Sequence, residues 1–374
     1  MFKKSLAAVA VLGAFAGSAL AADVQLYGLV DLGLNWTQVD KGTTTTDSFG
    51  MGSGQNSGSR FGLKGTEELG NGLKVGFKLE NGFQSDSGAL KSEKRIFDRE
   101  ASVSLYSDFG TLSMGRMGGV GSGAGTYDLV LATADAFDGG DNNVFGFATS
   151  DRYDNMVTYQ TPKFAGLQAT VQYSFNEDSV NDKDREGSSA VNRYASAALT
   201  GDFGALQTVL AYEFQNYQSF GEGARGEDGH IVYLGGNYDF EVAKVFVMGQ
   251  YFKGIQGSGA NALASMVKGA ELKTFDTDFD KGVKGFGAHV GTIVPVAGGD
   301  FTGGLYYVDS TVKYAEEDAD GKYYGVALKY EYPLSKRTSV YGGTGWYKAK
   351  VDYSADDVYK EEGYQAYLGL THCF

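Results

Sequence analysis

Along most of the chain, hydrophobic and polar residues alternate one by one. In residues 167–176 the odd-numbered positions are Leu, Ala, Val, Tyr and Phe, and the even-numbered positions are Gln, Thr, Gln, Ser and Asn. Residues 323–332 and 73–80 separate into two faces in the same way. A period of two predicts β-strands with one apolar and one polar face. A soluble sandwich would also alternate, so this pattern alone does not identify the solvent.

The aromatic residues favour a membrane. Tyr324 and Tyr332 lie eight residues apart on one predicted apolar face. At about 3.4 Å per residue and roughly 40° of strand tilt, this separation corresponds to about 20 Å of height. This height approaches that of the apolar band between the two aromatic girdles of an outer-membrane barrel.

Short turn sequences give a strand count. Seven tight connections are predicted, at residues 70–72, 108–110, 162–166, 202–204, 239–240, 295–299 and 333–336. Most of their centres lie 36 to 39 residues apart, and the two longer intervals contain extra residues near 118–151 and 256–281. If both termini lie on the short-turn side, these turns predict an all-β, 16-stranded antiparallel transmembrane β-barrel with short periplasmic turns and long extracellular loops. Such a barrel must close, because an unpaired strand edge is costly in lipid, and it encloses an aqueous lumen.

The start of the chain has the features of an export signal. Lys3 and Lys4 precede an apolar stretch over residues 6–20, and Ala19-Leu20-Ala21 is a small-residue cleavage site. We therefore predict a signal peptide over residues 1–21 and a barrel over 22–374, exported to the outer membrane. Cleavage after Ala21 or Ala22 would take the net charge from −14 to −16.

Composition excludes several other classes. Gly is abundant at 56 residues, but there are only 3 Pro, which is unlike collagen or a disordered linker. The net charge of −14 argues against a nucleic-acid partner. The one cysteine, Cys373, allows no intramolecular disulfide.

We predict no enzymatic activity and no metal or cofactor. The glycine-rich residues 118–125 lack the Lys-Ser or Lys-Thr of a phosphate-binding loop. Of the three histidines, His230 lies beside acidic residues, His289 lies within a strand and His372 lies at the chain end. No serine is placed beside them as an activated nucleophile, and His372 and Cys373 would point to opposite faces of a strand.

Several segments together resemble one family. They are Leu26-Tyr27-Gly28 with Asp31, Ser59-Arg60-Phe61-Gly62-Leu63-Lys64-Gly65, Phe109-Gly110-Thr111-Leu112 to Gly115-Arg116, Arg152-Tyr153-Asp154-Asn155, and His372-Cys373-Phe374. In this order the chain resembles the trimeric general porins of Gram-negative bacteria, of the betaproteobacterial type. The resemblance implies a homotrimer of barrels, a third long loop folded into each lumen, and Phe374 as a C-terminal insertion signal. Cys373 departs from the basic residue usual before the final Phe.

The resemblance also implies a constriction. The inward-folded loop, here called the constriction loop, corresponds to about residues 117–151. Its acidic candidates are Asp128, Asp135, Asp138 and Asp141. The candidates for the opposing basic wall are Arg60, Lys64, Lys78, Arg99, Arg116 and Arg152. Arg116 shares a strand face with Leu112 and Met114, so either a bulge or a protein-covered outer surface is expected there. Acid facing base across water would create a transverse field that orients solutes and filters ions.

Three functions remain open from the sequence. The first is a channel for passive diffusion of small hydrophilic solutes and ions, and a channel specific for one solute is a variant of it. A β-rich surface adhesin or binding protein with a dry core is the alternative. Tyr173, Leu328 and Leu368 point outward into lipid in a channel and inward in an adhesin. Outer-membrane lipid and lipopolysaccharide are the predicted partners of a channel, with divalent cations bridging acidic loops to lipopolysaccharide as one hypothesis.

Overall fold

A computed structural model describes residues 23–139, 144–180, 191–217, 219–220, 224–225, 227–255, 282–314, 317–354 and 357–374. The predicted signal peptide, Asp141 and the long insertion at 256–281 lie outside these residues. In the part of the chain that is described, no helix is long and apolar enough to cross a membrane.

Almost every described element is a strand. The strands of the main sheet are β1 Gln25–Asp40, β2 Thr45–Ser53, β3 Arg60–Gly70, β4 Leu73–Gly82, β5 Glu100–Ser107, β6 Gly110–Gly118, β7 Arg152–Gln160, β8 Leu167–Ser174, β9 Arg193–Phe203, β10 Leu206–Asn216, β13 Gly229–Asp239, β14 Lys244–Ile255, β15 Val283–Val296, β16 Gly299–Tyr314, β17 Glu317–Ser335, β18 Thr338–Ser354 and β19 Asp357–Cys373. A short hairpin, β11 Ser219–Phe220 with β12 Ala224–Arg225, and one helical turn, α2 Leu131–Ala134, complete the elements.

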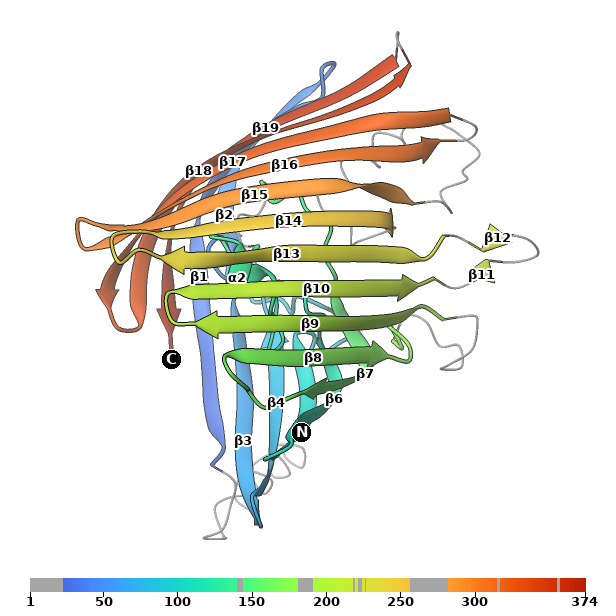
Figure 1. Ribbon diagram of the computed structural model, residues 1–374. Helices are drawn as coiled ribbons and strands as arrows, with labels where there is room; N and C mark the ends of the chain where they lie inside the picture. The colour runs from blue at the N-terminus through green and yellow to red at the C-terminus, as the bar shows by residue number, and fades with distance from the viewer. Residues whose placement is uncertain are drawn as a thin grey trace, which may run out of the picture.

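The strands close into one antiparallel barrel (Figure 1). Apart from β2 and β3, each strand of the main sheet pairs with the next, and β1 pairs with β19 from Leu29↔Cys373 to Asp40↔Glu362. β2 and β3 lie on the same edge of β1, with β2 against its second half and β3 against its first. They therefore share one position, and the 17 strands of the sheet make the 16 barrel positions that the sequence predicts. Closure leaves no strand edge open to lipid.

All seven predicted turns connect neighbouring strands. Asn71 and Ala297 adopt positive φ angles of 52° and 51° in two of them, and glycines follow at 72 and 298. The longer connections, including those that join β4 to β5 and β6 to β7, lie at the opposite ends of the strands. The predicted asymmetry of short and long connections is therefore confirmed.

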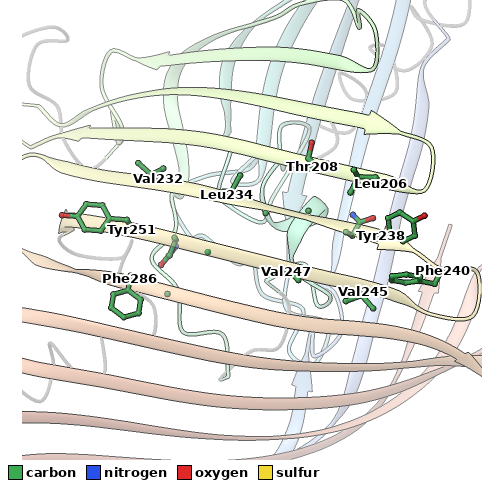
Figure 2. A pocket seen from close by; sticks show the side chains of 16 residues that line it. Leu206, Thr208, Val232, Leu234, Tyr238, Phe240, Val245, Val247, Tyr251 and Phe286 are labelled. Atoms are coloured by element: carbon green, nitrogen blue, oxygen red, sulfur yellow. The ribbon is translucent and has the colours of Figure 1, made fainter.

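The outer surface of the barrel is apolar. Tyr173, Leu328 and Leu368 are 38%, 40% and 62% exposed, and Tyr324 and Tyr332 are exposed on the same face of β17. Figure 2 shows a shallow groove on this outer face over β10 and β13–β15, where Leu234, Val247 and Phe286 flank glycines. A soluble adhesin would bury these side chains, so the adhesin hypothesis is wrong and the outward-facing prediction is confirmed.

Both chain ends of the barrel meet in one register. Gly28 and Phe374 exchange two backbone hydrogen bonds of 3.1 and 3.0 Å. A Cβ on Gly28 would lie 2.5 Å from the Phe374 ring and 2.6 Å from the carbonyl oxygen of Arg60. Only glycine therefore allows the last aromatic ring to pack against the first strand, which gives the Leu26-Tyr27-Gly28 motif a structural reason.

The barrel interior is filled on one side. The constriction loop enters it after β6, and its turn α2 packs against β10, β13 and β14, behind these strands in Figure 1. Phe145 and Phe147 form edge-to-face contacts with Tyr306 of β16 at 5.8 and 6.0 Å between ring centroids. This apolar packing holds the loop on the wall formed by β9–β18. The other side of the barrel interior is lined by charged residues of the loop and of β3–β5.

Candidate functional site

A buried carboxylate anchors the constriction loop. Glu213 of β10 is 0% exposed and accepts a hydrogen bond of 2.9 Å from the backbone N–H of Gly121 and one of 2.7 Å from Ser150 Oγ. The hydroxyls of Tyr194 and Tyr233 donate to the same carboxylate at 2.6 and 3.0 Å. One wall residue thus binds both the start and the end of the loop, because a buried charge needs several donors.

A second anchor holds the middle of the loop. The Tyr306 hydroxyl donates to Asp135 Oδ1 at 2.7 Å, and His289 Nε2 lies 3.1 Å from the same oxygen. The second oxygen of Asp135 accepts from the Gly139 backbone at 2.7 Å. Asp135 is only 2% exposed, so the prediction that it lines the water path is wrong. Its charge is used to fix the loop to β15 and β16.

The wall opposite the loop is a network of positively and negatively charged side chains. Arg99 Nε donates to Glu80 Oε1 at 2.7 Å, and the Tyr27 hydroxyl donates to Glu80 Oε2 at 2.8 Å. Lys78 Nζ lies 2.8 Å from Glu100 Oε2. Glu100 also accepts from the hydroxyl of Thr126, at 2.7 Å, and so connects the wall to the loop. Glu80 and Glu100 were not among the predicted site residues, although Glu80 shares a face of β4 with Lys78 and Glu100 directly follows Arg99.

The remaining predicted basic residues are placed as follows. Arg60 donates from Nη2 to Ser57 Oγ at 2.6 Å, and its charge acts on Asp138 of the constriction loop. Lys64 lies on the same face of β3 as Arg60, 5.2 Å from the centre of the Tyr27 ring. Arg152 begins β7 near the charges of Arg99 and Asp151. Arg60, Lys64, Lys78 and Arg99 therefore form one basic group, here called the basic wall.

Arg116 does not belong to the basic wall. It stays on the face of β6 that carries Met114, which is 50% exposed on the outside of the barrel. There its Nη1 donates to Asp154 Oδ1 at 2.8 Å, and Arg95 covers the same carboxylate at 2.9 Å. The expected bulge is present, because β7 has two residues opposite Arg116, and Asn155 in it has a φ of 50°. The candidate role of Arg116 in the wall is thus contradicted by its position on a protein-covered outer surface.

Two acids of the loop interact with each other. Asp128 and Asp138 lie close enough for their carboxyl groups to share a hydrogen bond. Burial, and then the Asp138 charge, raises the pKa of Asp128 to about 8. Burial also raises the pKa of Asp138, while Arg60 opposes that rise. Near pH 7 the pair therefore retains a proton and has less than its full negative charge.

Sequence reasoning missed several structural members of this site. Glu213 was missed because it is one polar residue among several in an alternating strand. His289 was considered only as a catalytic candidate, whereas it stacks on Tyr306 at 4.5 Å and its Nε2 accepts a hydrogen bond of 3.4 Å from the backbone N–H of Ala136 in the loop. Lys329 of β17 lies 5.8 Å from the Phe137 ring of the constriction loop. A polar residue on the inward face of a strand was the available signal in each case.

Known proteins share this architecture. A model of Gram-negative porins matches residues 7–352. The chain belongs to the Gram-negative porin family. It is 36% identical over 376 residues to an outer membrane porin protein of Bordetella pertussis, covering 91% of this chain and 92% of that protein. It is 32% identical over 355 residues to outer membrane porin protein 32 of Delftia acidovorans, covering 93% and 90%.

A solved structure agrees with this assignment. The anion-selective porin from Comamonas acidovorans superposes with a TM-score of 0.67 at 28% identity, covering 94% of this chain and all of that one. With the closed barrel and the apolar outer surface, membership of the family makes this protein a porin of the outer membrane. It forms a channel for passive diffusion of small solutes through the lumen of the barrel.

Proposed function

We propose that this porin favours small anions over cations and that the basic wall and the constriction loop form its filter. The observation that carries the proposal is the balance of charge among the basic wall, the two carboxylates paired with it and the Asp128–Asp138 pair. Arg60, Lys64, Lys78 and Arg99 contribute four positive charges, against two negative charges from Glu80 and Glu100. The Asp128–Asp138 pair retains a proton, so the sum at neutral pH is positive.

The net charge of −14 does not contradict this proposal. Screening limits the range of exposed charges to about 8–10 Å at physiological salt. The charges nearest a passing ion therefore dominate its energy, particularly where apolar barrel walls focus the field. The name of the Comamonas porin, anion-selective, supports the same preference for this chain.

The reversal potential in a KCl gradient tests the proposal. With the purified porin in a planar bilayer, we expect the reversal potential to have the sign that a higher permeability to chloride than to potassium produces. A reversal potential of the opposite sign would overturn the proposed anion preference. Potassium and chloride have similar mobilities in water, so the sign of the reversal potential reports the ion preference of the channel.

Raising the pH is expected to weaken the anion preference. Since the pKa of Asp128 is raised to about 8, the loop pair gains a second negative charge as the pH passes that value. The chloride-to-potassium permeability ratio should therefore be higher at pH 6 than at pH 9, values chosen roughly to bracket this pKa. Reversal potentials across this range measure the effect.

The matched control for the pH effect is Asp128→Asn. This variant cannot gain the second charge, so its permeability ratio should stay nearly constant from neutral to alkaline pH. A wild-type ratio that does not change, or a pH dependence that survives in Asp128→Asn, contradicts the assignment.

We further propose that three such chains assemble as a homotrimer and that residues 1–21 are a cleaved signal peptide. We also propose that lipopolysaccharide binds the outer surface of the barrel. Lys253 and Lys284 share strand faces with the exposed Tyr251 and Phe286, so they lie just beyond the apolar surface of β14 and β15. That position suits lipid phosphates. Native mass spectrometry would measure the mass of the assembly, the new N-terminus and bound lipid, and Lys284→Glu should lower lipid retention.

A further inference from the structure

A short segment interrupts the second position of the barrel. Residues 54–59, here called the inner ledge, separate β2 from β3, which otherwise continue along the same edge of β1. Gly54 starts the segment with a φ of 72°, and a Cβ there would lie 3.0 Å from the Cα of Gly58. The segment is therefore a tight turn within the barrel wall. It lies at a place where β2 could have continued directly into β3 along the edge of β1.

The carboxylate of Asp31 holds the inner ledge. Oδ1 accepts from the backbone N–H of Gln55 at 2.9 Å, and Oδ2 accepts from that of Ser57 at 3.3 Å. The Tyr341 hydroxyl donates to Oδ1 at 2.7 Å and the Thr371 hydroxyl to Oδ2 at 2.6 Å. Asp31 is 0% exposed, so four donors satisfy a buried charge and fix the ledge to β1, β18 and β19.

From this base the ledge extends across the inner face of the barrel. Lys329 Nζ donates to Asn56 Oδ1 at 2.6 Å, and Asn56 Nδ2 donates to Glu331 Oε2 at 3.2 Å. Both partners are on β17, so Asn56 spans β19 and β18, which lie between β1 and β17. Lys329 also lies 5.8 Å from the Phe137 ring of the constriction loop. The ledge and the loop thus meet at one lysine.

The other end of the ledge touches the basic wall. Ser57 Oγ accepts the 2.6 Å hydrogen bond from Arg60, and a Cβ added to Gly58 would lie 3.2 Å from Arg99 Nη1. The same six residues therefore lie against Arg60 and Arg99 and are connected to the constriction loop through Lys329.

We propose that the inner ledge is a second constriction element, which narrows the water path beside Asn56 and positions the guanidinium groups of Arg60 and Arg99. Its selectivity role rests on the proposed anion filter, whereas its narrowing role depends only on the porin channel. Asp31 and Ser57 are positioning residues in this arrangement. Asn56 and Lys329 belong to the part of the wall that solutes pass.

Chemical modification at Asn56 tests the narrowing role. In a Cys373→Ser background, which removes the exposed native thiol, the variant Asn56→Cys is inserted into planar bilayers. A negatively charged methanethiosulfonate reagent should lower its single-channel conductance by about a third or more, because bulk is added where the path is narrow. Thr43→Cys, on the exposed connection between β1 and β2, is the matched control and should show no change. Full modification of Asn56→Cys without a conductance change overturns the ledge as a constriction.

Removing the hydroxyl of Ser57 tests the positioning role. In Ser57→Ala, Arg60 loses its ledge partner, and the chloride-to-potassium ratio should change by about two- to fivefold, the equivalent of one hydrogen bond. The temperature of unfolding should stay close to that of the wild type, since Ser57 is half-exposed. An unchanged ratio overturns the positioning role. If the wild type itself prefers cations, the proposed filter fails, while the conductance result at Asn56 still decides whether the ledge narrows the path.

Discussion

The double variant Arg60→Gln/Arg99→Gln is expected to lose most of the proposed anion preference of this porin. Two unit charges at about 6 Å from a passing ion each contribute roughly 0.7 kcal/mol in a water-like dielectric, with opposite signs for chloride and potassium, so their removal changes the permeability ratio by about a hundredfold. The loss should exceed this value if the local dielectric is lower. Glutamine retains a hydrogen-bond donor, so Glu80 and Ser57, the acceptors for the two arginines, are not left unsatisfied. Reversal potentials in a KCl gradient measure the change.

Two controls remove one positive charge outside the filter. Lys163→Gln lies in the turn after β7, where the lysine pairs with Asp202 at 2.8 Å and is 53% exposed. Arg116→Gln lies on the outer face beside Asp154. Both variants should keep the wild-type ratio. An effect of Arg116→Gln as large as that of the double variant would contradict the position assigned to Arg116.

Replacing Glu213 by alanine is expected to release the constriction loop. The change leaves four buried donors without their acceptor, namely Gly121 N–H and the hydroxyls of Ser150, Tyr194 and Tyr233. Since each unsatisfied buried donor costs about 1–3 kcal/mol and some will find other partners, we expect a loss of at least about 3 kcal/mol in unfolding free energy. Urea unfolding in detergent micelles measures this loss.

The same variant should alter the channel. Once its anchor is lost, the loop occupies several positions, so single-channel currents should become noisier and larger on average. Glu213→Gln retains one acceptor oxygen and should show a smaller effect of the same sign. Glu67→Ala removes an exposed carboxylate of β3 and serves as the control. A Glu213→Ala protein with wild-type stability and quiet currents would show that the apolar contacts of the loop are sufficient.

Family membership and the inner geometry together explain how one barrel can admit small solutes and, in the proposed filter, distinguish ions by their charge. The apolar faces of the strands contact lipid, and the loop packs its own apolar side on the wall of β9–β18. The proposed filter therefore lies on the side where Lys78, Arg99 and Arg60 face the loop acids. The charges are held by buried partners, so the field that they produce is fixed before a solute arrives.

Local patterns in the sequence predicted the parts of the structure that depend on local physics. Alternation identified the lipid-facing side chains, such as Tyr173 and Leu368, because successive residues of a strand point to opposite faces. The turns fixed the number of strands, because residues such as Asn71 tolerate the positive φ that a tight connection needs. Alternation also placed Arg116 on the outer face, and only the family resemblance suggested the basic wall for it.

The tertiary structure decided which charges are buried and which groups they pair with. Asp135 and Asp128 are equally acidic in the sequence, yet Asp135 is enclosed by His289 and Tyr306, while Asp128 shares its site with Asp138. The interruption at residues 54–59 is set by Asp31, whose partners include Tyr341 and Thr371, more than 300 positions further along the chain. Alternation tells which face of the wall a residue occupies, but partners brought together by closure of the barrel determine whether its charge is buried, paired or open to water.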